Sequence, residues 1–223
     1  MSFPDTLKRQ GRDMDSNSPR YERPALSLIE RDIAGYGIDI YVGGMDGAGD
    51  LELLREKNIT TVVNCAVNLD FNYATEPFGE GEAADAIYGV GAVRYYKLGL
   101  IDGHGNPETM MLSGFYLLRG ALSQVLPDKA TYKRREKGNV LVNCRGGRSR
   151  SVSLVALFLH VEMPEKFPTL DAALDHVRTR RELRRDEWHE APKPMLVEAA
   201  RKAAQWIAMI DKGLPVPALA SKD

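Results

Sequence analysis

The stretch VLVNCRGGRSRSVSLVAL (residues 140–157) constrains the fold of this 223-residue chain more than any other feature. An apolar run ends at Asn143-Cys144, a loop with two glycines and three arginines follows, and a second apolar run begins directly after it. A short apolar run that stops at turn residues predicts a buried strand, and the second run predicts a buried helix. We therefore expect a strand, a tight loop and a helix in immediate succession.

Short strands alternate with helices along the rest of the chain. Asp50 and Thr169 are the expected N-caps of two helices. Residues 67–92 lack periodicity and are expected to form an irregular insertion. The alternation predicts an α/β fold with a central, mostly parallel sheet and helices on both faces. The expected strands are 37–44, 59–66, 92–102 and 139–144, and the expected helices are 49–58, 106–125, 150–162, 169–185 and 193–210.

The length fits one well-packed domain, which we expect at residues 25–212 between a polar tail (1–24) and a C-terminal tail (213–223). With 30 basic and 31 acidic residues, the net charge of −1 does not indicate a nucleic-acid partner. No apolar run is long enough for a membrane helix, and two cysteines cannot form a disulfide framework. We expect a cytoplasmic protein with reduced thiols and no metal or cofactor. Its oligomeric state does not follow from the sequence.

The loop after the strand has the composition of an anion site. Successive N–H groups of a glycine-rich loop converge on one point, and the dipole of the following helix adds positive charge there. Arg150, at the start of the helix, can donate two hydrogen bonds to a tetrahedral oxyanion. Such surroundings lower a cysteine pKa from about 8.5 to roughly 3.5–7.5. The loop is therefore expected to hold a phosphate against a thiolate of Cys144.

Cys144, five intervening residues, Arg150 and Ser151 match the C-x5-R-[ST] signature of cysteine-based protein phosphatases. Three further segments resemble the dual-specificity branch of that family, in the same order. The resemblance implies a protein tyrosine phosphatase-like fold and hydrolysis of phosphomonoesters through a cysteinyl-phosphate intermediate. The segments are IYVGGMDGAGDLELLREKNITTVVNCA (40–66), YYKLGLID (95–102) and TLDAALDHVRTRR (169–181).

The resemblance also implies roles for individual residues. Cys144 would be the nucleophile, Asp102 the general acid, and Ser151 a hydrogen-bond partner of the thiolate. His104 is a rival proton donor, and Asn64 would brace the phosphate-binding loop. Each role has a structural alternative: Cys144 as a buried structural cysteine and Asp102 as part of an Asp-Gly turn. Ser151 would then be a plain helix-start serine, and Asn64 would make its own local turn. The implied phosphate-binding residues are Arg145, Gly146, Gly147, Arg148, Ser149 and Arg150.

Two features depart from the family pattern. Asn143 stands where the family has histidine before its cysteine; its amide can donate hydrogen bonds to loop carbonyls but carries no charge. The insertion at 67–92 is longer than in the family and is a candidate for substrate recognition. Cys65 is expected beside Cys144, either as a reversible disulfide partner or as a core residue.

Arg145 and Arg148 bear on the substrate. Phosphorylated proteins are the leading expectation, with Tyr, Ser or Thr as the modified residue. The two arginines are similar to cations in phosphoinositide and phosphatidylglycerophosphate phosphatases, so a lipid or inositol phosphate is the alternative. A non-catalytic phosphate-binding protein is a third possibility. If Arg145 and Arg148 do not contact the substrate, they are expected to pair with acids of the insertion, namely Glu76, Glu80, Glu82 and Asp85.

The charged cluster 178–187 is expected to be solvated.

Overall fold

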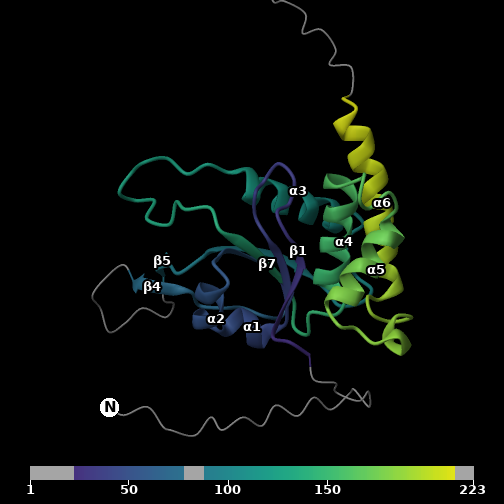
Figure 1. Cartoon of the computed structure of the whole chain (residues 1–223), viewed down its shortest axis with the longest axis horizontal. Helices are drawn as coiled ribbons and strands as arrows, with labels where there is room; N and C mark the ends of the chain where they lie inside the picture. Colours follow the sequence, from purple (N-terminus) through teal and green to yellow (C-terminus); the bar gives the residue numbers. More distant parts are fainter. Residues whose placement is uncertain (1–22, 78–87, 214–223) are drawn as a thin grey trace, which may run out of the picture.

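The computed structural model describes residues 23–77 and 88–213 (Figure 1). Both terminal tails fall largely outside these residues, as do Glu80, Glu82 and Asp85 of the insertion. None of the described helices is both long and apolar enough to cross a membrane.

A five-stranded sheet with the order β1-β2-β7-β3-β6 forms the centre of the described part. Strands β2, β7, β3 and β6 are parallel, and β1 pairs antiparallel with β2 at the edge. The fold class predicted from the sequence is thus confirmed, although β1 was not predicted. The bounds are β1 Leu26–Glu30, β2 Ile40–Gly43, β3 Ile59–Ala66, β6 Arg94–Leu100 and β7 Asn139–Asn143.

The helices cover both faces of the sheet, as predicted (Figure 1). Asp50 and Thr169 cap α2 and α5 as expected, because each side chain accepts hydrogen bonds from N–H groups of the first turn. Helix α3 starts later than predicted, because Asn106 belongs to the preceding loop. The bounds are α1 Met45–Gly49, α2 Leu51–Glu56, α3 Thr109–Ser123, α4 Arg150–Glu162, α5 Leu170–Arg180 and α6 Pro194–Asp211.

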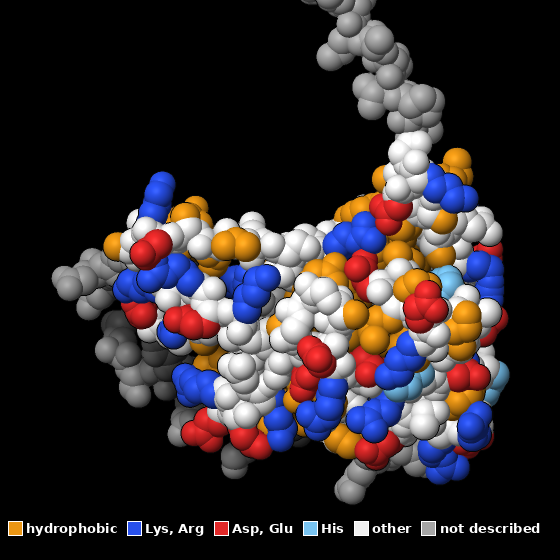
Figure 2. Space-filling view, turned by 45° about the horizontal axis from the view of Figure 1, so that its top comes forward, with side chains coloured by type: hydrophobic (Ala, Val, Ile, Leu, Met, Phe, Trp, Pro, Cys, Tyr) orange, Lys and Arg blue, Asp and Glu red, His pale blue; other side chains and the backbone are white. Residues whose placement is uncertain are grey.

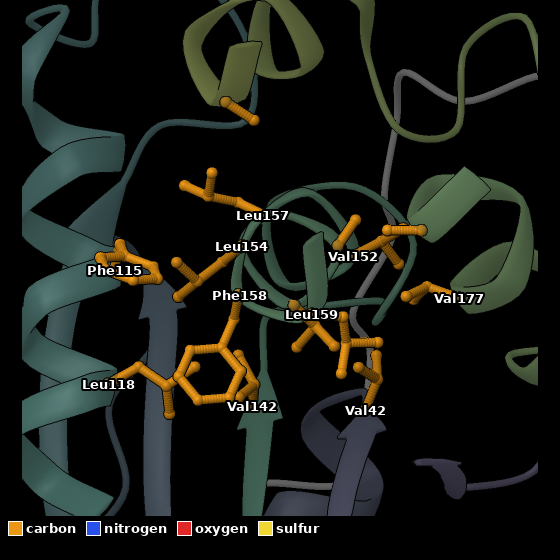
Figure 3. Close-up of a cluster of buried hydrophobic side chains, with 14 of the residues drawn as sticks. Val42, Phe115, Leu118, Val142, Val152, Leu154, Leu157, Phe158, Leu159 and Val177 are labelled. Atoms are coloured by element: carbon orange, nitrogen blue, oxygen red, sulfur yellow. The ribbon is translucent and has the colours of Figure 1, made fainter. Parts of the chain in front are cut away.

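Side chains of β7 alternate between two hydrophobic cores. Val140 and Val142 face the large core under α3 to α6, whereas Leu141 faces the small core under α1 and α2. Helix α4 is buried from Arg150 to Leu159 and lies at the centre of the large core, where Phe158 packs beside Phe115 of α3 (Figure 3). The strand and the helix on either side of Cys144 are therefore both largely buried.

The 67–92 segment is not wholly irregular, which corrects the prediction. Within its described part, β4 (Ala74–Pro77) and β5 (Gly89–Gly91) pair as an antiparallel ribbon. Glu76 of this ribbon forms an ion pair with Lys133, and Arg134 donates to the carbonyl of Gly91. The ribbon thus packs against the loop that precedes β7. Figure 2 shows acidic and basic side chains interspersed over one face of the molecule.

Candidate active site

The loop 144–149, called here the cysteine loop, runs from the end of β7 to the start of α4. Gly147 has a φ of +63°, and a Cβ atom there would lie 2.5 Å from the carbonyl oxygen of Gly43. Only glycine fits this left-handed backbone so close to β2. The N–H of Met45 also donates to the carbonyl of Arg145 (2.9 Å). The end of β2 and the turn after it therefore pack directly against the cysteine loop.

Cys144 lies at the bottom of the loop and is 2 % exposed. Its Sγ is 3.3 Å from Oγ of Ser151, in the first turn of α4. Burial raises the pKa of Cys144, but the Arg150 charge and hydrogen bonds from Ser151 and Ser149 outweigh burial, so that the pKa is lowered below that of an ordinary thiol. The thiolate form of Cys144 is thus favoured, and a thiolate can act as a nucleophile.

Arg150 is 3 % exposed and is held by the ends of two strands. One terminal nitrogen, Nη1, donates to the carbonyl of Leu100 (3.1 Å) at the end of β6 and lies 3.4 Å from Oδ1 of Asn68, beyond β3. Its buried Nε has no partner among the described residues. A buried guanidinium with an unpaired donor can donate charge-assisted hydrogen bonds to an oxyanion.

Asp102 and His104 lie in the loop that follows β6 and are both exposed. The side chain of Asn106 closes this loop: its Oδ1 accepts from the N–H of Ile101 (2.8 Å), and its Nδ2 donates to the carbonyls of Ile101 (2.9 Å) and Gly103 (3.1 Å). Arg150 and this loop are adjacent, since Arg150 binds Leu100. The structure therefore brings Asp102 to the same edge of the sheet as Cys144.

Cys65 is fully buried near Cys144, and both thiols are free. Parallel pairing of β3 with β7 places Asn64 opposite Asn143, so the two cysteines follow at the next position of each strand. Burial raises the pKa of Cys65 well above its usual value, and the neighbouring Cys144 raises it further. Cys65 is therefore a neutral thiol next to a polarised one.

The two asparagines differ from their expected supporting roles. Nδ2 of Asn64 donates to the carbonyl of Leu69 (2.6 Å) and the hydroxyl of Tyr95 (2.8 Å), and its Oδ1 accepts from the N–H of Ala66 (2.9 Å). These bonds organise the turn after β3, in line with the local-turn alternative. Asn143 is fully buried, and neither amide atom has a hydrogen-bond partner in the described part of the chain. Donation from Asn143 to loop carbonyls is thus not observed.

The other members of the cysteine loop have distinct surroundings. Ser149 is buried, and its Oγ accepts from the N–H of Lys193 (2.9 Å). Arg145 is exposed, as is Gly146. Nη2 of Arg148 pairs with Glu187 (3.1 Å) and Glu190 (3.6 Å). Arg148 therefore pairs with acids, as the alternative held, but these acids lie before α6 rather than in the insertion.

The expectation that the 178–187 cluster is solvated was wrong for Arg181, which is 2 % exposed. Its Nε donates to the carbonyl of Gly147 (3.1 Å), and its Nη1 donates to the carbonyl of Pro24 (2.5 Å) and Oγ of Ser27 (2.9 Å). Burial lowers the pKa of Arg181 to about 10. Helical spacing gave a usable signal, since Arg181 follows buried Val177 by four residues.

Glu187 also departs from that expectation, because it is only 6 % exposed. It forms an ion pair with Arg23 as well as with Arg148. Burial raises the pKa of this carboxyl, but the bond from Arg23, the N–H of Arg184 and the Arg148 charge outweigh burial and lower it. Arg23, in the predicted N-terminal tail, is thus connected to the cysteine loop through Glu187.

Comparison with known proteins supports the fold. No protein-family model and no curated protein matches the sequence. A single-residue variant of human DUSP28 is similar in structure, with a TM-score of 0.57, 16% identity, and coverage of 84% of this chain and 99% of that one. A mouse putative dual specificity phosphatase complexed with zinc tungstate has a TM-score of 0.57 and 18% identity, with coverage of 87% of this chain and 95% of that one. The Yvh1 phosphatase domain from Chaetomium thermophilum has a TM-score of 0.54 and 20% identity, with coverage of 84% of this chain and 98% of that one. At these identities the similarity shows the fold of dual-specificity phosphatases.

Proposed function

We propose that this chain is a cysteine-dependent phosphatase that hydrolyses phosphomonoesters, with phosphorylated Tyr, Ser or Thr of proteins as its substrates. The carrying observation is the Cys144–Ser151 pair at the base of a glycine loop, beside a buried Arg150 whose Nε has no partner in the described part of the chain. These groups supply a nucleophile, a hydrogen-bond donor for it and an oxyanion site. The family fold supports the same interpretation.

In the first step, the Cys144 thiolate attacks phosphorus, and an S–P bond forms as the P–O bond to the leaving group breaks. The N–H groups of the cysteine loop and Arg150 stabilise the charge on the three equatorial oxygens. Asp102 gives its proton to the leaving oxygen. His104, on the same exposed loop, is the competing donor.

In the second step, water attacks the cysteinyl-phosphate and the S–P bond breaks. The carboxylate of Asp102 takes the proton of this water. The hydroxyl of Ser151, 3.3 Å from the sulfur, donates to the departing thiolate. The step releases inorganic phosphate and needs no cofactor.

The ion pairs of Arg148 favour a protein substrate over a polyanionic lipid or inositol phosphate. Glu187 and Glu190 already compensate the charge of Arg148, so this side chain is less available for a second phosphate. Arg145 is exposed at the start of the loop, where it would lie near the substrate residues that flank the phosphate.

Turnover of a small aryl phosphate by the wild-type chain and by Cys144→Ser tests the proposal. The serine variant retains the loop and should bind phosphate or tungstate, but its turnover should fall to background. Appreciable turnover by Cys144→Ser would contradict the nucleophile assignment, and binding without turnover by the wild type would indicate a non-catalytic phosphate-binding protein. A parallel comparison of phosphopeptides with phosphoinositide vesicles distinguishes the substrate classes.

A further inference from the structure

Lys193 contacts both loops of the candidate site. Its backbone N–H donates to Oγ of Ser149 (2.9 Å) in the cysteine loop, and its Nζ donates to the backbone carbonyl of Asp102 (2.8 Å). Lys193 is the N-cap residue of α6 and has an extended backbone (φ −60°, ψ 140°), with Pro194 in the first turn. The rigid start of this helix therefore fixes where the lysine side chain begins.

Among the described residues, few outside the loop that carries Asp102 (101–106) form hydrogen bonds with its backbone. Asn106, which closes it, belongs to the loop itself. Lys193 lies outside this loop (residues 101–106) and donates a hydrogen bond to the loop backbone, at the carbonyl of Asp102. Gly103 and Gly105 both have positive φ angles, so the loop backbone is intrinsically permissive. The Lys193 contact can therefore restrict the position of Asp102 relative to the cysteine loop.

We infer that Lys193 is a positioning residue that sets the distance between the acid Asp102 and the cysteine loop. This inference rests on the proposed function, with Asp102 as the proton donor. A general acid acts only within hydrogen-bond reach of the leaving oxygen, and a displacement of about 1 Å can cost on the order of 100-fold in rate. Lys193 links the two loops, because its backbone N–H binds Ser149 and its side chain binds the backbone of Asp102. It therefore restricts such displacement.

The variant Lys193→Met tests the inference because methionine retains an apolar stem but has no donor, and the backbone bond to Ser149 is unaffected. For substrates with poor leaving groups, such as alkyl phosphates, kcat/KM, which reports the steps up to P–O cleavage, should fall about 10- to 100-fold. For a dinitrophenyl phosphate, whose leaving group needs no proton, kcat/KM should change less than about 2-fold. Lys193→Arg, which retains a cationic donor, should recover most of the lost rate.

The double variant Asp102→Ala with Lys193→Met separates positioning from general structural damage. If Lys193 acts through Asp102, the double variant should be no slower on poor leaving groups than Asp102→Ala alone. Losses that multiply would overturn the inference. Lys212→Met, at the exposed C-terminal end of the same helix, is the matched control and should behave as wild type.

The outcomes distinguish this inference from the proposed function. If the wild type hydrolyses phosphomonoesters but Lys193→Met loses the same factor in kcat/KM on both kinds of leaving group, only the positioning role is overturned. If the wild type hydrolyses none, the proposed function fails and the positioning role fails with it. Faster amide hydrogen exchange of residues 101–106 in Lys193→Met, with unchanged exchange in α4, would further support the contact.

Discussion

Replacing Gly147 by alanine tests whether the cysteine loop depends on its close approach to β2. An alanine at a φ of +63° costs about 1–2 kcal/mol because a Cβ atom crowds the left-handed backbone. The new Cβ would also lie 2.5 Å from the oxygen and 2.6 Å from the carbon of the Gly43 carbonyl. This backbone is fixed, since β2 pairs with β1 on one side and β7 on the other. The overlap adds about 1–3 kcal/mol, and the total loss is about 2–5 kcal/mol.

Gly146→Ala is the matched control in the same loop. The nearest atom to a Cβ at Gly146 is 3.7 Å away, in the side chain of Arg148, which is ordinary contact. This variant should lose less than about 0.5 kcal/mol. Urea unfolding followed by circular dichroism, with equal m-values as the condition for comparison, measures both losses. In thermal unfolding, the Tm of Gly147→Ala should be lower than that of the wild type by about 2–4 °C for each kcal/mol of stability lost. Equal stability of the two alanine variants would refute the requirement for glycine at 147.

Three further predictions concern buried polar groups. The folded pKa of Glu187 is lowered, so its contribution to stability is full above the ordinary glutamate value of 4.5 and is lost as pH falls through the lowered value. Acid titration of unfolding should therefore show Glu187→Gln losing stability at neutral pH, with the difference from wild type vanishing in acid; a difference independent of pH would contradict this. Asn143→Leu should lose no more than about 1 kcal/mol in urea unfolding, because both amide atoms are buried without a described partner; a larger loss would mean that the amide is satisfied. Peroxide should oxidise Cys144 to a sulfenic acid, which the thiol of Cys65 converts to a disulfide with loss of water; mass spectrometry showing only sulfinic or sulfonic acid at Cys144 would exclude this.

The site residues that the sequence revealed are close together in the chain. Cys144, Arg150 and Ser151 are brought together by one strand, one tight loop and the first turn of one helix, so local backbone geometry decides their arrangement. The buried helix α4 was predictable for the same reason, since its apolar residues are contiguous. Asp102 was placed by its position at the end of a recognisable strand.

The antiparallel strand β1 could not be read from residues 26–30, because a short edge strand depends on its pairing partner more than on intrinsic preference. The ribbon β4–β5 depends likewise on pairing between segments that have little periodicity of their own. In both cases the hydrogen bonds that define the strand come from another part of the chain.

What the sequence by itself determined is therefore the strand, loop and helix around Cys144, whereas the tertiary structure decided what surrounds that loop. Arg181 reaches the carbonyl of Gly147 from 34 positions away, and Lys193 reaches Asp102 from 91 positions away. Charge and composition gave no reason to separate these cations from their solvated neighbours, although the four-residue spacing from buried Val177 was a signal for Arg181. Their roles depend on which face of α5 and which end of α6 pack beside the loop, and only the packed core fixes that.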